Sequence, residues 1–145
     1  MNSSHRGQHA SAGCSMPSRE AQRLMDQAPR YGEIIEAGAR RIRELHKRTR
    51  ETFRGRDTKE GRKAWEAASA EFHAAYDALA FPGGYESGLR SIQQGDADAI
   101  EAALVFLELR PYFFRSQYMR KKFIRLLKHA VLTADQTRRL ELVRA

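Results

Sequence analysis

The sequence has one cysteine, four prolines and no long apolar run, and each shortage excludes a class of protein. A single cysteine, Cys14, cannot form an intramolecular disulfide, and it excludes a zinc site built from several cysteines. The longest uninterrupted apolar stretch covers residues 102–107, whereas a transmembrane helix needs about 20 such residues. The small number of prolines leaves room for long helices. We therefore expect a helical protein that has no disulfide framework and does not cross a membrane.

The length and composition predict one folded domain preceded by a tail that does not fold. Hydrophobic residues make up 41% of the chain and charged residues 30%, as in globular proteins. Residues 1–17 are rich in serine and have no large apolar residue except two methionines, so they cannot bury enough surface to offset the entropy of ordering. We expect residues 1–17 to be a disordered N-terminal tail. Residues 18–145 are expected to form a single all-helical domain, because about 145 residues are typical of one domain.

Apolar side chains recur every three or four residues, which predicts helices throughout this domain. A short helix is expected over residues 18–27, followed by Pro29, which ends or restarts it. A long helix follows over residues 30–53. Asp57 and Glu60 have the spacing of a capping box, so they are expected to open the next helix, which continues to residue 80.

The two long helices are expected to pair as an antiparallel hairpin over about residues 30–80, with their apolar faces together. Gly32 and Gly38 lie in the first helix, where glycine either weakens the helix or permits close packing. Trp65 and Phe72 recur at helical spacing in the second helix and are expected to be buried.

Four shorter helices are expected in a second half that covers about residues 85–144. Gly95 is expected to end the first of them in a left-handed conformation, and Asp96 to cap the second. Thr133 and Gln136 have the capping-box spacing at the start of the last. The expected bounds are 85–94, 97–110, 116–130 and 133–143. The sequence therefore predicts an all-α fold, in which a long N-terminal helical hairpin is joined to a compact four-helix, solenoid-like half.

The helix over residues 97–110 is predicted to lie at the centre of the core. Its only acidic side chains are Asp98, Glu101 and Glu108, and the last two are seven residues apart on one narrow face. Nearly all its other residues are apolar, so the helix should be buried on almost every side. The core residues expected in this half are Leu104, Leu107 and Phe123.

Positive charge is concentrated at the two ends of the chain. The net charge is +8, from 26 Lys and Arg against 18 Asp and Glu. Residues 57–109 are net acidic, whereas residues 1–56 and 110–145 are net basic. Such segregation creates either a basic face that attracts polyanions or two faces that attract each other. Most of the cationic residues are arginine, but a GC-rich genome would also produce an excess of arginine over lysine.

The first candidate binding feature is a row of cations on the helix over residues 30–53. The row is Arg40, Arg43, Lys47, Arg50 and Arg54, whose steps of three and four residues place them on one ridge about 20 Å long. A ridge of this length can follow several phosphates. A solvated helix flank with local Glu–Arg pairs would give the same pattern. The candidate binding residues of the ridge are Arg40, Arg43, Lys47 and Arg50.

The second candidate feature is the stretch over residues 110–134, which contains seven Lys or Arg and no acid. Its helix has an apolar face toward the core and a basic face opposite, and a tyrosine beside cations can stack on a base. The candidate binding residues here are Arg115, Tyr118, Lys121, Lys122, Arg125 and Lys128. Arg115, Arg120 and the aromatic connector at residues 111–114 flank the same turn and are expected to form one patch.

Motifs of catalysis are absent from the sequence. There is no phosphate-binding loop, no nucleophile elbow and no metalloprotease helix. His46, His73 and His129 lie on three different expected helices, and His46 fits a packed position at the edge of an apolar face. No cofactor and no metal site is expected. An enzyme whose site is assembled from scattered residues stays open, although binding without catalysis is favoured.

The leading hypothesis is a small basic helical module that associates with nucleic acid or another polyanion. The alternative is a protein–protein adaptor whose basic and acidic faces meet complementary partners, such as an acidic protein. A membrane partner is not expected, because the apolar face of the basic helix is needed for the core. In the absence of a targeting signal, the cytoplasm is the default expectation. The specific partner, any sequence preference and the oligomeric state are not predicted.

Overall fold

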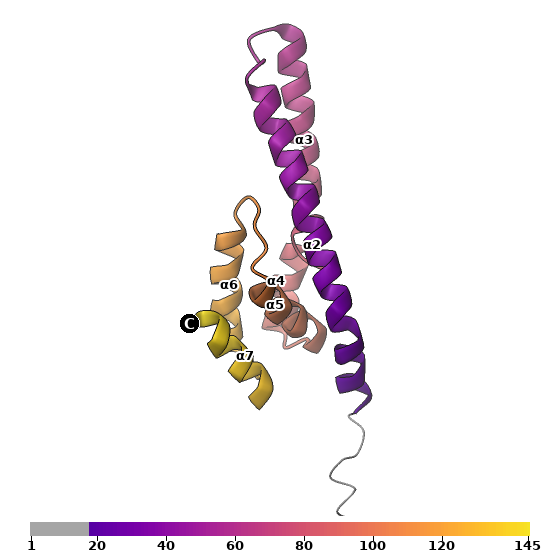
Figure 1. The fold of residues 1–145 in the computed structure, drawn as a ribbon, viewed down its shortest axis with the longest axis vertical. Coiled ribbons are helices and arrows are strands. Elements are labelled where there is room, and N and C mark those ends of the chain that lie inside the picture. The colour runs from indigo at the N-terminus through magenta and orange to yellow at the C-terminus, as the bar shows by residue number, and fades with distance from the viewer. Residues whose placement is uncertain (1–17) are drawn as a thin grey trace, which may run out of the picture.

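The computed structural model describes the backbone of residues 18–145 and the side chains of residues 18–19 and 30–145 (Figure 1). Within this range all regular elements are helices, which confirms the predicted all-α class. The predicted tail over residues 1–17 lies outside the described residues. The helices are α2 (Arg19–Phe53), α3 (Lys59–Ala80), α4 (Tyr85–Gln93), α5 (Ala97–Leu109), α6 (Ser116–Lys128) and α7 (Ala134–Arg144).

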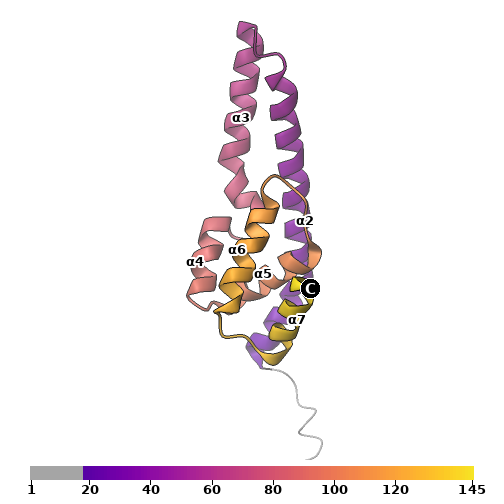
Figure 2. The ribbon, with the colours of Figure 1, turned by 90° about the vertical axis from the view of Figure 1, so that its left-hand side faces the viewer.

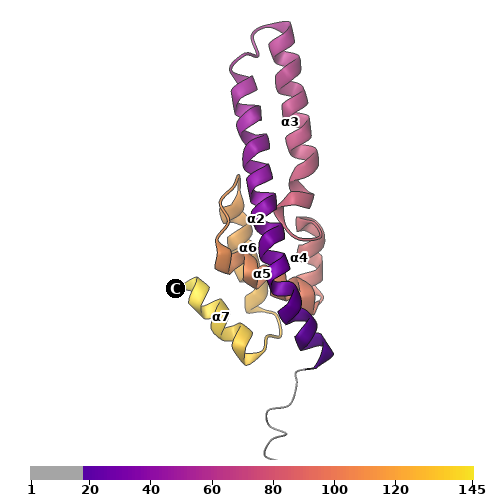
Figure 3. The same ribbon diagram turned by 45° about the vertical axis from the view of Figure 1, so that its right-hand side comes forward.

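Helices α2 and α3 form the predicted long antiparallel hairpin, and its far end extends beyond the four shorter helices (Figure 1, Figure 2 and Figure 3). Gly38 lies where the backbones of α2 and α3 approach each other closely, because a Cβ atom there would collide with the carbonyl oxygen of Leu79. Of the two roles that the sequence left open for Gly38, the structure supports close packing.

Helix α2 is longer than expected, because Pro29 neither ends nor restarts it. The helix runs without a break from Arg19 to Phe53. Proline removes one backbone hydrogen bond from a helix. However, a helix that residues 31–53 have already nucleated through packing extends past this point without a new nucleation cost. The sequence alone could not weigh that packing against the proline.

Two further predictions for the hairpin are corrected. The N-cap of α3 is Thr58, whose hydroxyl accepts a hydrogen bond from the Gly61 amide at 3.0 Å, and not Asp57. Asp and Thr are both preferred N-cap residues, so the sequence pattern could not separate the two neighbours. Trp65 is half-buried and not buried. It packs edge-on against Phe53 with ring centroids 5.4 Å apart, near the end of the hairpin, where no third helix covers it.

Helix α5 is the centre of the core, as predicted, because it packs against α2, α4, α6 and α7. Every residue from Ala99 to Leu107 is buried. Leu104, Leu107, Phe123 and Phe72 are buried as expected, each at most 4% exposed. The core therefore lies where the hairpin meets the four shorter helices, and the far part of the hairpin has only its own two faces to bury.

The caps of the shorter helices are mostly as predicted. Gly95 has a positive φ of 80°, Asp96 accepts a hydrogen bond from the Ala99 amide, and Thr133 and Gln136 form a complete capping box. Helix α5 ends one residue earlier than expected, since Arg110 takes the left-handed conformation with a φ of 50°. Consecutive helices from α3 to α7 pack pairwise, which gives the solenoid-like succession of the second half.

Candidate functional site

The predicted binding residues lie on the surface of the molecule. Among the ten, Lys122 is half-buried and the other nine are exposed. They lie on α2, in the connector between α5 and α6, and on α6 itself. The four on α2 are Arg40, Arg43, Lys47 and Arg50; the six others are Arg115, Tyr118, Lys121, Lys122, Arg125 and Lys128.

The ridge on α2 is joined to the connector, here residues 111–115, by a direct contact. Arg43 donates a hydrogen bond from Nη1 to the carbonyl oxygen of Tyr112 at 2.7 Å. From Arg40 to Arg50 the ridge covers about 15 Å of α2 at ~1.5 Å per residue. The ridge therefore follows the hairpin past the point where the connector approaches it, and Figure 2 shows the connector passing between α2 and the start of α6.

The connector is fixed from inside by aromatic contacts. Phe113 is buried in the core. The Tyr76 hydroxyl on α3 donates to the carbonyl oxygen of Phe114 at 2.5 Å, and the Phe114 ring lies 4.8 Å from the ring of His46 on α2. The connector is thus held against both helices of the hairpin.

Two titratable groups behind the connector are perturbed by burial. Burial raises the pKa of Tyr76 to about 12, against the opposing charge of Arg115, so its hydroxyl stays protonated and remains a donor. Burial, assisted by the charge of Arg50, lowers the pKa of His46 below its ordinary value. His46 packs against Phe72 at a ring distance of 5.2 Å, as its position on the apolar edge predicted. Both groups support the surface and do not lie on it.

Arg115 and Tyr118 form a pair at the start of α6. Arg115 is left-handed, with a φ of 67°. Its guanidinium carbon lies 4.9 Å from the centroid of the Tyr118 ring and 5.8 Å from that of Phe114. The Tyr118 ring is 66% exposed. A cation over a solvent-accessible aromatic ring is therefore present where the sequence predicted one.

The basic face of α6 points away from the core. Met119, Phe123 and Leu127 are buried on one side of the helix, while Lys121, Arg125 and Lys128 on the other side are exposed. Helix α6 packs against α4, α5 and α7. The structure therefore brings the two predicted cation groups together only at the connector, and their far ends diverge along separate helices.

Arg120 does not join the patch that was expected around the connector. Its guanidinium donates hydrogen bonds to the carbonyl oxygens of Leu107, at 3.1 Å, and Val143. These bonds tie α6 to the ends of α5 and α7. Burial, together with the charge of Arg110, lowers the pKa of Arg120. Arg120 was grouped with Arg115 by its place in the chain, but helix rotation points the two side chains in different directions.

The candidate cations differ from the four cations of the described residues that form ion pairs. Arg41 and Arg48 form ion pairs with Glu71 on α3, and Arg138 and Arg139 pair with acids on α7 and α5. Within the described part of the chain, none of the nine candidate cations forms an ion pair. The charge of the ridge and of α6 is therefore not neutralised within this part of the molecule.

Tyr112 belongs to the aromatic connector that the sequence placed in a patch with Arg115, but the sequence did not single it out as the most exposed ring. Its ring is 77% exposed, although its neighbour Phe113 is only 5% exposed. The aromatic run at residues 112–114 was visible in the sequence. Only the path of the chain between α5 and α6 could show which rings face the solvent.

The described residues contain no group of three or more His, Cys, Asp or Glu side chains placed to hold a metal ion. Within the same residues, no helix is long and apolar enough to span a membrane. No protein-family model, curated protein or solved structure matches the chain. The chemistry of the surface itself is therefore the basis for the proposal that follows.

Proposed function

We propose that this protein binds nucleic acid through the basic surface formed by the α2 ridge, the connector and the outer face of α6, and that it does so without catalysis. The observation that carries the proposal is a concentration of cations that have no acidic partner. The nine on this surface form no ion pair within the described residues, and residues 110–134 contain seven Lys or Arg and no acid.

A phosphate backbone suits such a surface because its charges are regularly spaced and solvent-accessible. Duplex DNA carries one negative charge per about 1.7 Å of axis, and each phosphate that a cation neutralises releases condensed counterions. Phosphate contacts position a protein on a nucleic acid but do not read its bases. The proposal therefore implies strong dependence on salt and little preference for sequence.

The test is a charge reversal with a matched control. The triple variant K121E/R125E/K128E removes three exposed cations from α6. The control K59E/R62E/K63E makes the same change of charge in the first turns of α3, where all three residues are exposed. Acidic side chains are stabilising near a helix N-terminus, so this change should not weaken α3. We expect the α6 variant to weaken binding to a labelled oligonucleotide much more than the control does.

The salt dependence gives an independent measurement. The slope of log K against log salt on duplex DNA should become less steep by roughly 0.9 for each phosphate that the α6 variant no longer neutralises. Circular dichroism of both variants should match the wild type, since the exchanged side chains point away from the core. If wild-type protein shows no binding to duplex or single-stranded probes at 50 mM salt, the proposal is wrong.

The adaptor hypothesis makes a different prediction for the same variants. An acidic protein would also be attracted to unpaired cations, but binding to nucleic acid at physiological salt would then be absent. Loss of a protein partner in the α6 variant, without any binding of nucleic acid by the wild type, would favour the adaptor.

A further inference from the structure

Three of the four exposed large aromatic side chains in the described part of the chain lie within seven residues of each other. Tyr112 is 77% exposed, Tyr118 is 66% exposed and Phe114 is 40% exposed, whereas the fourth, Phe53, lies at the far end of the hairpin. A folded protein usually covers rings of this size. Their concentration where the ridge meets α6 therefore calls for an explanation.

The exposed rings lie on a backbone that is held in place by its neighbours. The carbonyl oxygen of Tyr112 accepts the hydrogen bond from Arg43, and that of Phe114 accepts the one from Tyr76. These bonds fix the connector while the Tyr112 ring itself stays in solvent. The left-handed conformation of Arg115, which is unfavourable for a residue with a Cβ atom, accompanies the placement of its guanidinium over Tyr118.

We propose that the ligand is single-stranded nucleic acid, whose unpaired bases stack on Tyr112 and Tyr118 while its phosphates contact Arg115 and the neighbouring cations; this inference rests on the proposed function. Unpaired bases offer flat faces that stack on tyrosine and on the guanidinium plane of arginine. A duplex hides those faces within its own stack. Exposed rings among unpaired cations therefore favour a single strand over a duplex.

The outer face of α6 continues the same surface. Lys121, Lys122 and Arg125 follow Tyr118 at helical steps, and the helix from Tyr118 to Lys128 is about 15 Å long. A strand whose bases stack at the connector can therefore extend along α6 with its phosphates beside lysine and arginine. Stacking on any base is sequence-tolerant, which agrees with phosphate contacts that read no sequence.

The experiment compares two probes and three variants by fluorescence anisotropy. The probes are a labelled 12-nucleotide oligothymidylate strand and a 12-base-pair duplex at the same salt concentration. The first variant, Y112L/Y118L, removes both rings. The second, Y112F/Y118F, keeps the rings but removes their hydroxyls, and the third is F53L. The last is a matched control, because Phe53 is an exposed ring far from the connector.

We expect the wild type to bind the single strand more tightly than the duplex. The Y112L/Y118L variant should lose roughly 5-fold or more in affinity for the strand for each stacking ring removed, the low end of the effect of such rings. The loss should be smaller on the duplex, the phenylalanine variant should recover most of the affinity, and F53L should bind the strand like the wild type.

Two results would overturn the inference in distinguishable ways. Tighter binding to the duplex, or unchanged strand affinity in Y112L/Y118L, would exclude base stacking while leaving nucleic-acid binding in place. Absence of binding to either probe by the wild type would reject the proposed function and the stacking inference together. Circular dichroism of Y112L/Y118L checks that a lower affinity does not come from unfolding.

Discussion

His46 shows how one side chain joins both halves of the hairpin to the connector. From α2 its ring packs against Phe72 on α3 and against Phe114 in the connector, at ring distances of 5.2 and 4.8 Å. Burial and the nearby charge of Arg50 both disfavour the protonated form and lower its pKa. The neutral ring thus stabilises the inner side of the candidate surface.

His46 should make stability depend on pH in a defined direction. The folded pKa is lower than the value of about 6.5 in an unfolded chain, so on acidification the unfolded state takes up the proton first. The contribution to the free energy of unfolding is therefore present above about pH 6.5 and lost as the pH falls through the folded pKa. Urea denaturation at pH 7.5 and pH 5 should show a smaller loss for His46→Phe than for the wild type.

His73 provides the matched control, since it is an exposed histidine on α3. His73→Phe should retain the pH dependence of the wild type. If the stability of the wild type and of His46→Phe depends on pH to the same extent, burial of His46 does not contribute to that dependence.

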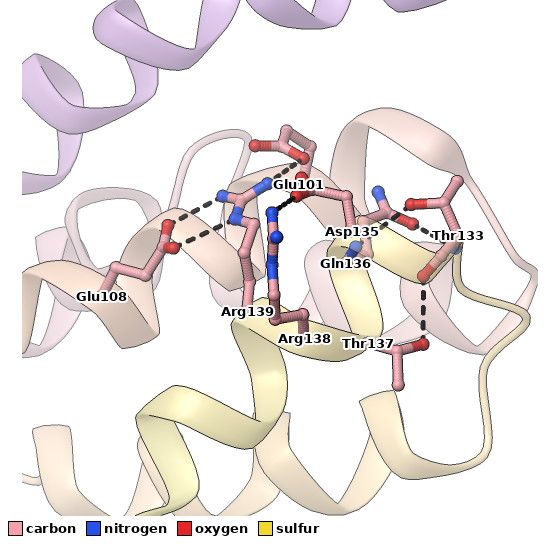
Figure 4. A network of polar contacts seen from close by, with 8 residues as sticks. All are labelled: Glu101, Glu108, Thr133, Asp135, Gln136, Thr137, Arg138 and Arg139. Atoms are coloured by element: carbon pink, nitrogen blue, oxygen red, sulfur yellow. Dashed lines mark hydrogen bonds and ion pairs between the residues drawn. The ribbon is translucent and has the colours of Figure 1, made fainter.

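Arg138 and Arg139 are adjacent in sequence but have different surroundings (Figure 4). Arg139 donates from Nε and Nη2 to Glu108 at 3.0 and 2.7 Å and from Nη1 to Glu101 at 2.9 Å. The hydrogen bonds to Glu108, assisted by the charge of Glu101, raise the pKa of Arg139 further in spite of burial. Arg138 instead pairs with Asp135 on the same exposed face of α7.

Replacing Arg139 should destabilise the protein far more than replacing Arg138. Arg139→Ala leaves Glu101, whose side chain is 9% exposed, without its cation, and this should cost about 3 kcal/mol of the free energy of unfolding. Arg138→Ala should stay within about 0.5 kcal/mol, because an exposed pair contributes little. Chemical denaturation of both variants measures the difference. A similar loss of unfolding free energy in both variants would contradict a structural role for the contacts of Arg139 with Glu101 and Glu108.

At the scale of single elements, the glycines of α2 differ in what surrounds them. A Cβ atom at Gly38 would collide with the backbone of Leu79 on α3, whereas one at Gly32 would meet only Leu109 Cδ1 at 3.7 Å, an ordinary contact distance. Helix propensity is the same at both positions. Packing therefore decides whether replacing each glycine by alanine stabilises or destabilises the protein.

Alanine at these two positions should have opposite effects. Gly32→Ala should stabilise the protein by up to about 1 kcal/mol, the difference in helix propensity. Gly38→Ala gains the same propensity but forces α2 and α3 apart, so a net loss of about 1–3 kcal/mol is expected. Thermal denaturation of both variants provides the comparison. A stabilised Gly38→Ala variant would show that the hairpin is not closely packed at Leu79.

At the scale of the whole molecule, burial is unevenly distributed. Helix α5 packs against four other helices, but the end of the hairpin around the turn at residues 54–58 has only α2 and α3. The candidate surface lies between these regions, where the connector joins the hairpin to the second half. Its backbone is therefore supported by the core, although its cations and rings face the solvent.

Amide hydrogen exchange should follow this distribution. Amides of α5 are expected to exchange only with global unfolding, because their opening exposes the core. Amides of α2 and α3 next to residues 54–58 should exchange much faster through local opening of the hairpin end. Equal protection at the two places would mean that the hairpin end is stabilised by contacts that the fold does not show.

The sequence by itself determined the features that depend on neighbouring residues. The caps at Asp96 and Thr133, the left-handed Gly95 and the apolar circumference of α5 follow from spacing and side-chain chemistry within a few positions. The hairpin was also predictable, since two long apolar faces joined by a short turn have few other ways to be buried.

Only the tertiary structure decided which side chains of the candidate surface face the solvent and which contact other parts of the protein. Arg120 turned inward to two carbonyl oxygens, Tyr112 stayed outside while Phe113 was buried, and the continuity of α2 past Pro29 emerged only in the fold. Each outcome depends on packing between segments distant in sequence, and local propensities of a few tenths to about 3 kcal/mol are too small to oppose it.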